Sequence, residues 1–534
     1  MNPLASTKCA GRLLLALAAI ASILLMAGCG SSSSVTPVNP VGFTNGSLKG
    51  TYVFSVQGAD ASGYPLALAG TLVADGNTGI TGGTMDVIDP FFDTSPNTPP
   101  SPAAQPITPG SYAVGADGRG QISLTTAAYG TYILDFVLTS PSQGLVSEFD
   151  ANGNGSGTID LQTAVTSLSQ LAQPYAFSLA GSDSGLFPFA TTGAFTLNSS
   201  GASTAGVEDF NDNAVPINQG SLTAAATVGS GTGPGTITLT SNFGPLLFDY
   251  YPTDATHFKL IETDYDYAYL AGDVFTQVAA SIPTGPMVFT MAGGTTASGP
   301  VADGGLMTSD GTGNFSGGLE DANNDGDVPP QLSFTGALDA AASGPTGGRV
   351  FVNLSGSFFP ATNWVIYPSS GGLLMLEADH ANVTSGAGYA QQTGATLAAS
   401  QNFGLNLSAI DLGNGSGIYE EDDIAQFLTT GSGFSGAVDI NDGGETYFGQ
   451  SLDGAYTLDS PATGRGEATT TAAGSSFVDF IFYAVSNDQF LLLETDGNQI
   501  GAGTFATQNS GVNPNSRRVI VHPAVRPHAA ARRK

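Results

Sequence analysis

Four pairs of carboxylates are the side chains of this sequence whose type and spacing best suit chemistry. Each pair has the pattern Glu-x-Asp and ends an apolar run such as Leu491-Leu492-Leu493. Residues two apart on a strand share one face, and like charges that close raise each other's proton affinity unless a cation lies between them. The pairs are Glu148 and Asp150, Glu262 and Asp264, Glu377 and Asp379, and Glu494 and Asp496.

The fourfold occurrence of these pairs favours a structural role over catalysis. Two carboxylates can hydrolyse a glycoside, but an active site would need the pair once, in a cleft. Between the first 29 residues and the tail, only His257 and His380 supply imidazoles, and that stretch has no cysteine. Zinc and thiol chemistry are therefore not expected. We predict that the protein is not an enzyme, with a carbohydrate-active glycoside hydrolase as the alternative.

Two further stretches are candidates for ligand binding. The oxygen-rich spacing of Asp321, Asn323, Asp325 and Asp327 is that of a calcium loop, although Leu332 stands where a bidentate Glu belongs. It predicts a weak calcium site, with a polar turn as the alternative and no other cofactor. Tyr265, Tyr267 and Tyr269 alternate with other residues, so one strand face could stack sugars; an edge strand is the alternative.

Internal repetition determines the predicted architecture. An alternating strand recurs at Tyr52, Tyr175, Met287 and Phe403, spaced by 123, 112 and 116 residues. Each copy then has Asp-Gly or related turns, a Gly-x-x-Asp, a later glycine turn and the Glu-x-Asp strand, in the same order. Three of those later turns carry Arg119, Arg349 or Arg465, for which we predict pairing with the same copy's carboxylates.

We therefore predict an all-β protein of four tandem antiparallel modules with about eight strands each. Small up-and-down barrels are favoured, with two-sheet sandwiches as the alternative, arranged as a rod or a compact cluster. The predicted segments are a signal peptide (1–28), a flexible tether (29–47), modules 1 to 4 (48–164, 170–278, 285–392 and 399–508) and a basic tail (509–534) expected to be disordered.

The charge is concentrated between the signal and the tail. That stretch holds all 44 acidic residues but only five basic ones, Lys49, Arg119, Lys259, Arg349 and Arg465, a net charge of −39. Such a surface repels phosphate backbones, so binding of nucleic acid is excluded.

The first 29 residues predict export. Lys8 and Arg12 precede an apolar run, Leu13 to Leu25, that is too short to span a bilayer. The following Met26-Ala27-Gly28-Cys29 resembles the lipobox of bacterial lipoproteins, with Met26 where Leu is usual. The resemblance implies lipid attachment at Cys29 and, because Gly30 rather than Asp follows, sorting to the outer membrane. Several acyl chains together would give durable attachment.

These patterns predict a lipid-anchored cell-envelope protein with a non-enzymatic binding or structural role. The expected partners are the membrane, through Cys29, and an envelope or extracellular glycan or protein. Besides the carbohydrate-active enzyme, a lipocalin-like carrier of a small apolar ligand is an alternative, and it would need an open lumen inside a module.

Overall fold

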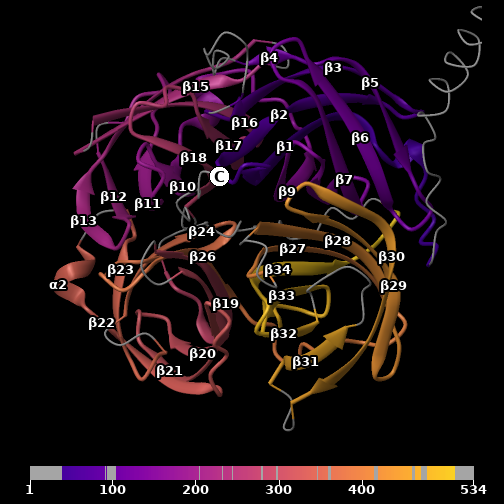
Figure 1. Cartoon of the computed structure of the whole chain (residues 1–534). Coiled ribbons are helices and arrows are strands. Elements are labelled where there is room, and N and C mark those ends of the chain that lie inside the picture. The colour runs from indigo at the N-terminus through magenta and orange to yellow at the C-terminus, as the bar shows by residue number, and fades with distance from the viewer. Residues whose placement is uncertain are drawn as a thin grey trace, which may run out of the picture. The chain divides into compact units, whose positions relative to one another are not determined.

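Alternating apolar residues form antiparallel strands along nearly the whole described chain (Figure 1). The computed structural model describes residues 39–90, 92, 104–203, 205–230, 233–242, 244–277, 281–295, 299–344, 347–358, 362–413, 419–459, 463–470 and 478–511. The strands form four successive sheets, two of them closed eight-stranded barrels. The predicted fold class, four tandem antiparallel β-modules, is confirmed. Cys29 and the basic residues of the tail lie outside the described residues.

Module 1 is a nine-stranded sheet in which β2 pairs with both β1 and β3, so that the sheet closes on itself. A 3-10 helix, η2 (Asn45–Ser47), precedes it. Its strands are β1 (Lys49–Asp60), β2 (Pro65–Asp75), β3 (Gly79–Ile88), β4 (Gln105–Pro106), β5 (Thr108–Val114), β6 (Arg119–Thr126), β7 (Gly130–Ser140), β8 (Gln143–Asp150) and β9 (Gly153–Leu161).

Module 2 is also nine-stranded, and its first and last strands, β10 and β18, pair with each other. The 3-10 helix η3 (Leu168–Leu171) leads into it. Its strands are β10 (Pro174–Asp183), β11 (Pro188–Thr196), β12 (Gly206–Asp212), β13 (Val215–Ser221), β14 (Thr223–Thr227), β15 (Gly235–Ser241), β16 (Gly244–Asp254), β17 (His257–Glu262) and β18 (Ala268–Thr276).

Module 3 is a closed barrel with one short helix, α2 (Ala340–Ser343), between two of its strands. Its strands are β19 (Thr284–Thr295), β20 (Gly299–Asp310), β21 (Phe315–Asn324), β22 (Leu332–Leu338), β23 (Val350–Ser355), β24 (Asn363–Ser369), β25 (Gly372–Glu377) and β26 (Val383–Ala390).

Module 4 is the second closed barrel. Its strands are β27 (Asn402–Asp411), β28 (Tyr419–Thr429), β29 (Gly433–Asp442), β30 (Glu445–Leu458), β31 (Arg465–Thr470), β32 (Asp479–Ala484), β33 (Gln489–Glu494) and β34 (Gln499–Thr507).

Each module has a core of its own inside the sheet. In module 4 the rings of Phe490 and Phe505 stack at 4.6 Å, and Phe403 meets Phe505 edge-on at 5.4 Å. The glycine of each Gly-x-x-Asp allows close packing: a Cβ at Gly436 would lie 1.9 Å from the Gln426 carbonyl oxygen. The interiors are therefore filled by side chains, as the period-2 pattern predicts.

Apolar residues on the outer faces of the strands join the modules. One buried cluster combines residues of modules 2, 3 and 4, among them Phe275, Tyr367 and Tyr483. A second includes Val53 of module 1 and Ile261 of module 2, and a third joins Val137 of module 1 to Ile424 of module 4. Since module 1 contacts module 4 as well as module 2, the modules form a cluster and not a rod.

Truncating a barrel core tests this packing. Phe505→Ala removes a ring that is 1% exposed and contacts four other aromatic rings. We expect it to lower the free energy of unfolding by about 3–5 kcal/mol, measured by urea denaturation. Phe187→Ala, at a side chain that is 42% exposed, is the matched control and should change it by less than about 0.5 kcal/mol. Equal effects of the two variants would contradict a filled interior.

Candidate functional site

The aspartate of Gly-x-x-Asp binds the repeated arginine of another module. In module 2, Asp209 accepts hydrogen bonds from Nε and Nη2 of Arg349 in module 3, both at 2.6 Å. The hydroxyl of Tyr367, also in module 3, donates to Asp209 at 2.6 Å. All three side chains are buried, so this is a bidentate, charge-assisted contact shielded from water.

The same contact recurs at two further junctions. Arg465 of module 4 binds Asp321 of module 3 through Nε and Nη2 at 2.9 Å, with Tyr483 Oη donating at 2.6 Å. Arg119 of module 1 donates through Nη1 to both oxygens of Asp439 of module 4, at 3.2 and 3.3 Å. The arginines thus join modules 2 to 3, 3 to 4 and 4 to 1.

This pairing corrects the expectation that each arginine binds the Glu-x-Asp of its own module. The arginine lies at or just before a strand start and reaches the aspartate of another module, whereas the glutamates of Glu-x-Asp are buried away from it. One of them, Glu148, accepts a hydrogen bond from Asn441 of module 4. The local repeat pattern shows which residues recur, but it does not show which module lies opposite an outward-facing side chain.

An asparagine two residues after that aspartate makes a second repeated contact. Its side-chain amide donates to backbone carbonyls of the Glu-x-Asp segment in the neighbouring module, at distances between 2.7 and 3.4 Å. Asn211 reaches Glu377, Asp379 and Asn382; Asn323 reaches Glu494, Asp496 and Gln499; Asn441 reaches Glu148, Asp150 and Gly153.

The junction between modules 1 and 2 lacks both contacts. Pro234 stands where the other modules have arginine, and Ile88 where they have asparagine. Here Tyr251 of module 2 donates its hydroxyl to Asp86 of module 1, and Ile88 packs beside Tyr251, Ile261 and Ala271. Burial and nearby Asp249 raise the pKa of Asp86 to about 8, as expected without an arginine beside it.

The aspartates of Glu-x-Asp hold hairpins within their modules. In every module one oxygen accepts a backbone N–H from the first residues of the preceding strand or from the residue just before it. The donors are Ile133 to Asp150 (2.8 Å), Leu247 to Asp264 (3.0 Å), Asn363 to Asp379 (2.6 Å) and Val478 to Asp496 (3.3 Å). The repeated aspartates therefore have a structural use common to all four modules.

The glutamates of the same pairs are buried inside the modules. Glu148, Glu262, Glu377 and Glu494 are at most 1% exposed. Burial, and then the neighbouring aspartate, raises the pKa of Glu262 to about 10 and raises the pKa values of the other three well above the usual range. These shifts favour the neutral form of the carboxyl in all four modules.

The predicted calcium ligands are not gathered around one point. Both oxygens of Asp321 are bound by Arg465, and the amide of Asn323 faces module 4. Asp325 follows β21 with a φ of 52°, in the turn that also contains Asp327. Two of the four predicted ligands are thus used in junctions between modules. The Asp-x-Asn spacing that suggested calcium is the spacing of the junction residues.

The three tyrosines do not form one platform. Tyr265 lies in a turn, donates to the Val87 carbonyl of module 1 at 2.8 Å and meets Tyr269 edge-on at 5.5 Å. Both pack against the cluster between modules 1 and 2, whereas Tyr267 is 48% exposed. Two of the three rings therefore belong to a junction.

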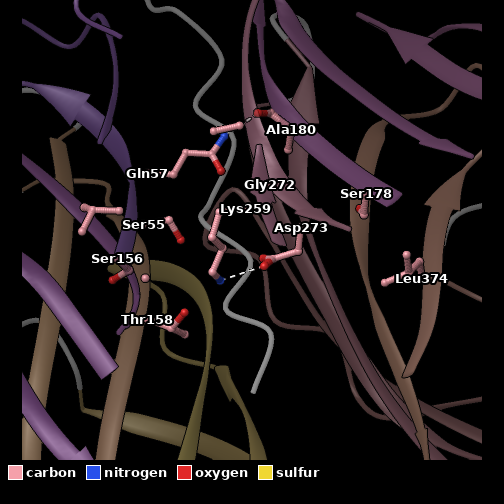
Figure 2. Close-up of a pocket in the computed structure, with 13 residues that line it drawn as sticks. Ser55, Gln57, Ser156, Thr158, Ser178, Ala180, Lys259, Gly272, Asp273 and Leu374 are labelled. Atoms are coloured by element: carbon pink, nitrogen blue, oxygen red, sulfur yellow. Dashed lines mark hydrogen bonds and ion pairs between the residues drawn. The ribbon is translucent and has the colours of Figure 1, made fainter. Parts of the chain in front are cut away.

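Module 2 contains a buried charged trio that the sequence analysis did not single out. Lys259 Nζ and His257 Nε2 contact Asp273 Oδ1 at 2.7 and 2.6 Å. Burial opposes ionisation of Asp273, but Lys259 and His257 outweigh it and hold the pKa well below its usual range. A cavity of about 30 Å³ adjoins the ion pair, lined mainly by modules 1 and 2 and touched by Leu374 of module 3 (Figure 2). Comparing the four copies position by position would have revealed this trio.

One further group of carboxylates lies in module 4. Asp411, Glu421 and Asp442 each place one oxygen within 4.8 Å of the others, the only such group of three or more potential ligands among the described residues. It consists of hard oxygen donors, which suit Ca²⁺ or Mg²⁺ rather than zinc.

Comparison with known proteins leaves the chain without a family. No family model and no curated protein matches it. Similar solved structures include intact Ap-TbpB with its N and C lobes (10% identity, 68% of this chain and 84% of that chain, TM-score 0.18). Another is a mutant of the vaccine antigen transferrin binding protein B from Haemophilus parasuis Hp5 (8% identity, 73% and 86% coverage, TM-score 0.20). At these TM-scores the likeness carries no functional argument.

Among the described residues, no helix has the length and apolar character needed to cross a bilayer.

Removing one junction amide tests the coupling of modules 4 and 1. Asn441→Ala leaves three carbonyls of module 1, two of them in buried hydrogen bonds, without this donor, which should cost about 1–3 kcal/mol. We expect faster hydrogen exchange in β8, β9 and β29, measured by mass spectrometry. Asn498→Ala, at an exposed turn position, is the control and should leave exchange in these strands unchanged. Unchanged exchange in Asn441→Ala would contradict the role of the amide.

The buried glutamates predict greater stability in mild acid. The pKa of Glu262 is raised from 4.5 to about 10 on folding, so its stabilising contribution is complete below about pH 4.5 and is lost as the pH rises towards 10. We expect the melting temperature to fall between pH 5 and pH 8. Glu262→Gln, which stays neutral, should flatten this slope by up to about 1 kcal/mol per pH unit, whereas exposed Asp488→Asn should not. Identical slopes in the wild type and Glu262→Gln would contradict a neutral buried acid.

Proposed function

We propose that the protein is a lipid-anchored cell-envelope protein whose four β-modules have a non-enzymatic binding or structural role. The observation that carries this proposal is the use of the repeated polar residues. The arginines, aspartates and asparagines that recur from module to module join modules or hold hairpins. Side chains used in this way build a scaffold, and a scaffold supports binding through the surface that it presents.

The filled module interiors support this role over that of a carrier. Each module has a packed core of its own, with aromatic residues such as Phe54, Phe177, Phe289 and Phe403 at 0% exposure. A lipocalin-like carrier requires an apolar lumen large enough for its ligand.

The placement outside the cytoplasm rests on Cys29 and its lipobox resemblance. Acylation there would attach the modules to the outer membrane through the segment that precedes Asn39. The partners of this proposal are the membrane, through Cys29, and an envelope or extracellular glycan or protein at the module surface.

Replacing the lipobox cysteine tests the anchor. Full-length protein made in a Gram-negative host should incorporate labelled palmitate and sediment with the outer membrane, whereas Cys29→Ser should do neither. Cys9→Ser, the other cysteine of the chain, is the matched control and should keep both properties. Labelling of Cys29→Ser would show that the lipid is attached elsewhere.

The same preparation tests the non-enzymatic role. Incubated with purified envelope glycans, the protein should be retained by one or more of them without producing new reducing ends. Release of reducing sugars that scales with protein concentration would instead establish the carbohydrate-active enzyme.

A further inference from the structure

The charged trio of module 2 interrupts the repeat at positions where the other modules are uncharged. Lys259 and Asp273 face each other across β17 and β18. The equivalent cross-strand pairs are Leu145 with Thr158, Leu374 with Ala387, and Leu491 with Thr504. Three copies thus build the same strand pair without charge, so the fold does not require the ions. A buried ion pair is often no more stable than an apolar one of similar size, so stability alone does not account for it.

Lys259 differs in its environment from the other four basic residues between the signal peptide and the tail. Arg119, Arg349 and Arg465 are bound at the junctions between modules, and Lys49 is exposed. Lys259 is 2% exposed, and among the described residues its ammonium, which has three N–H donors, forms its ion pair with Asp273. Two donors therefore remain for a ligand.

The cavity beside Lys259 suits a small acceptor. Hydroxyl groups of Ser55 in β1 and Ser178 in β10, which occupy equivalent positions in the repeat, line it with Lys259 (Figure 2). A volume of about 30 Å³ is enough for one or two water-sized particles and excludes a sugar or an acyl chain. The Asp273 carboxylate also lines this space, paired with Lys259, and the remaining ammonium and hydroxyl donors fit a halide-sized anion.

The cavity lies where such an anion could join two modules. Its lining comes mainly from β1 and β9 of module 1 and from β10, β17 and β18 of module 2. This is the junction that lacks the arginine and asparagine contacts, because Pro234 and Ile88 replace them.

We propose that the cavity binds a small monovalent inorganic anion such as chloride, held by Lys259 with Ser55 and Ser178, which joins modules 1 and 2 in place of the missing Arg–Asp contact. The proposal goes beyond the envelope role above and does not depend on acylation of Cys29. The groups facing Lys259 are Asp273 and, through it, His257, and the remaining ammonium protons of Lys259 bind the anion.

The test compares sodium chloride with sodium gluconate, whose anion is too large for the cavity, at equal ionic strength so that screening is the same. The purified full chain should melt about 2–4 °C higher in chloride and should broaden the ³⁵Cl NMR line. Hydrogen exchange in β1 and β17 should slow in chloride, while exchange at the junction of modules 3 and 4 should not change.

The chain itself supplies the matched variant. His257→Gln with Lys259→Leu and Asp273→Thr restores the residues that module 1 has at these positions, Gln143, Leu145 and Thr158. This variant should lose the chloride response, whereas Lys49→Ala should keep it. Equal melting of the wild type in both salts, or the same chloride response in the triple variant, would overturn the proposal and indicate water or an adventitious ion only. If the triple variant does not fold, the ³⁵Cl line width and the hydrogen-exchange pattern of the wild type decide whether chloride binds at the junction of modules 1 and 2.

Discussion

The buried contact between an arginine of one module and the aspartate of another is the constraint on which this structure depends. A guanidinium and a carboxylate taken out of water are strongly destabilising unless each satisfies the other, so the contact permits only a narrow range of module positions. At Asp209 and Asp321 the arginine forms two hydrogen bonds and a tyrosine hydroxyl adds a third. The asparagine two residues further on then attaches to the main chain of the neighbour. These directional contacts act together with the apolar clusters between the modules, whose packing has no such directional preference.

This use of charge explains how so acidic a chain can pack. Part of its negative charge is reduced in the folded state, because burial raises the pKa values of the four glutamates in the Glu-x-Asp pairs and so favours their neutral form. The three arginines of the modules are placed against the aspartates of the junctions. Neutral acids inside the modules and paired ions between them are two solutions to the same desolvation cost.

The junction at which the repeated residues are replaced is also informative. Modules 1 and 2 meet through Tyr251, Asp86 and Ile88, without an arginine. Close to this junction, module 2 has the lysine and aspartate that no other module has at those positions. The junction lacks the arginine and asparagine contacts, and module 2 has an added Lys259–Asp273 pair close to it. We explain these two departures from the repeat together, since Lys259 can supply the cation that the junction lacks.

The sequence by itself determined the all-β class, the number of modules, the strand that opens each one and the glycine turns between strands. These features depend on the local alternation of apolar and polar residues and on backbone preference, and their recurrence in four modules makes them recognisable in the sequence. The Asp-x-Asn spacing and the repeated arginines could also be recognised in the sequence, but the residues that they contact could not. Only the tertiary structure decided that Asp321 and Asn323 face module 4 rather than calcium, that Arg349 crosses to Asp209, and that Lys259 lies beside a cavity. An outward-facing side chain finds its partner through the packing of whole modules, and that packing is set by contacts between residues 140 to 320 positions apart in the chain.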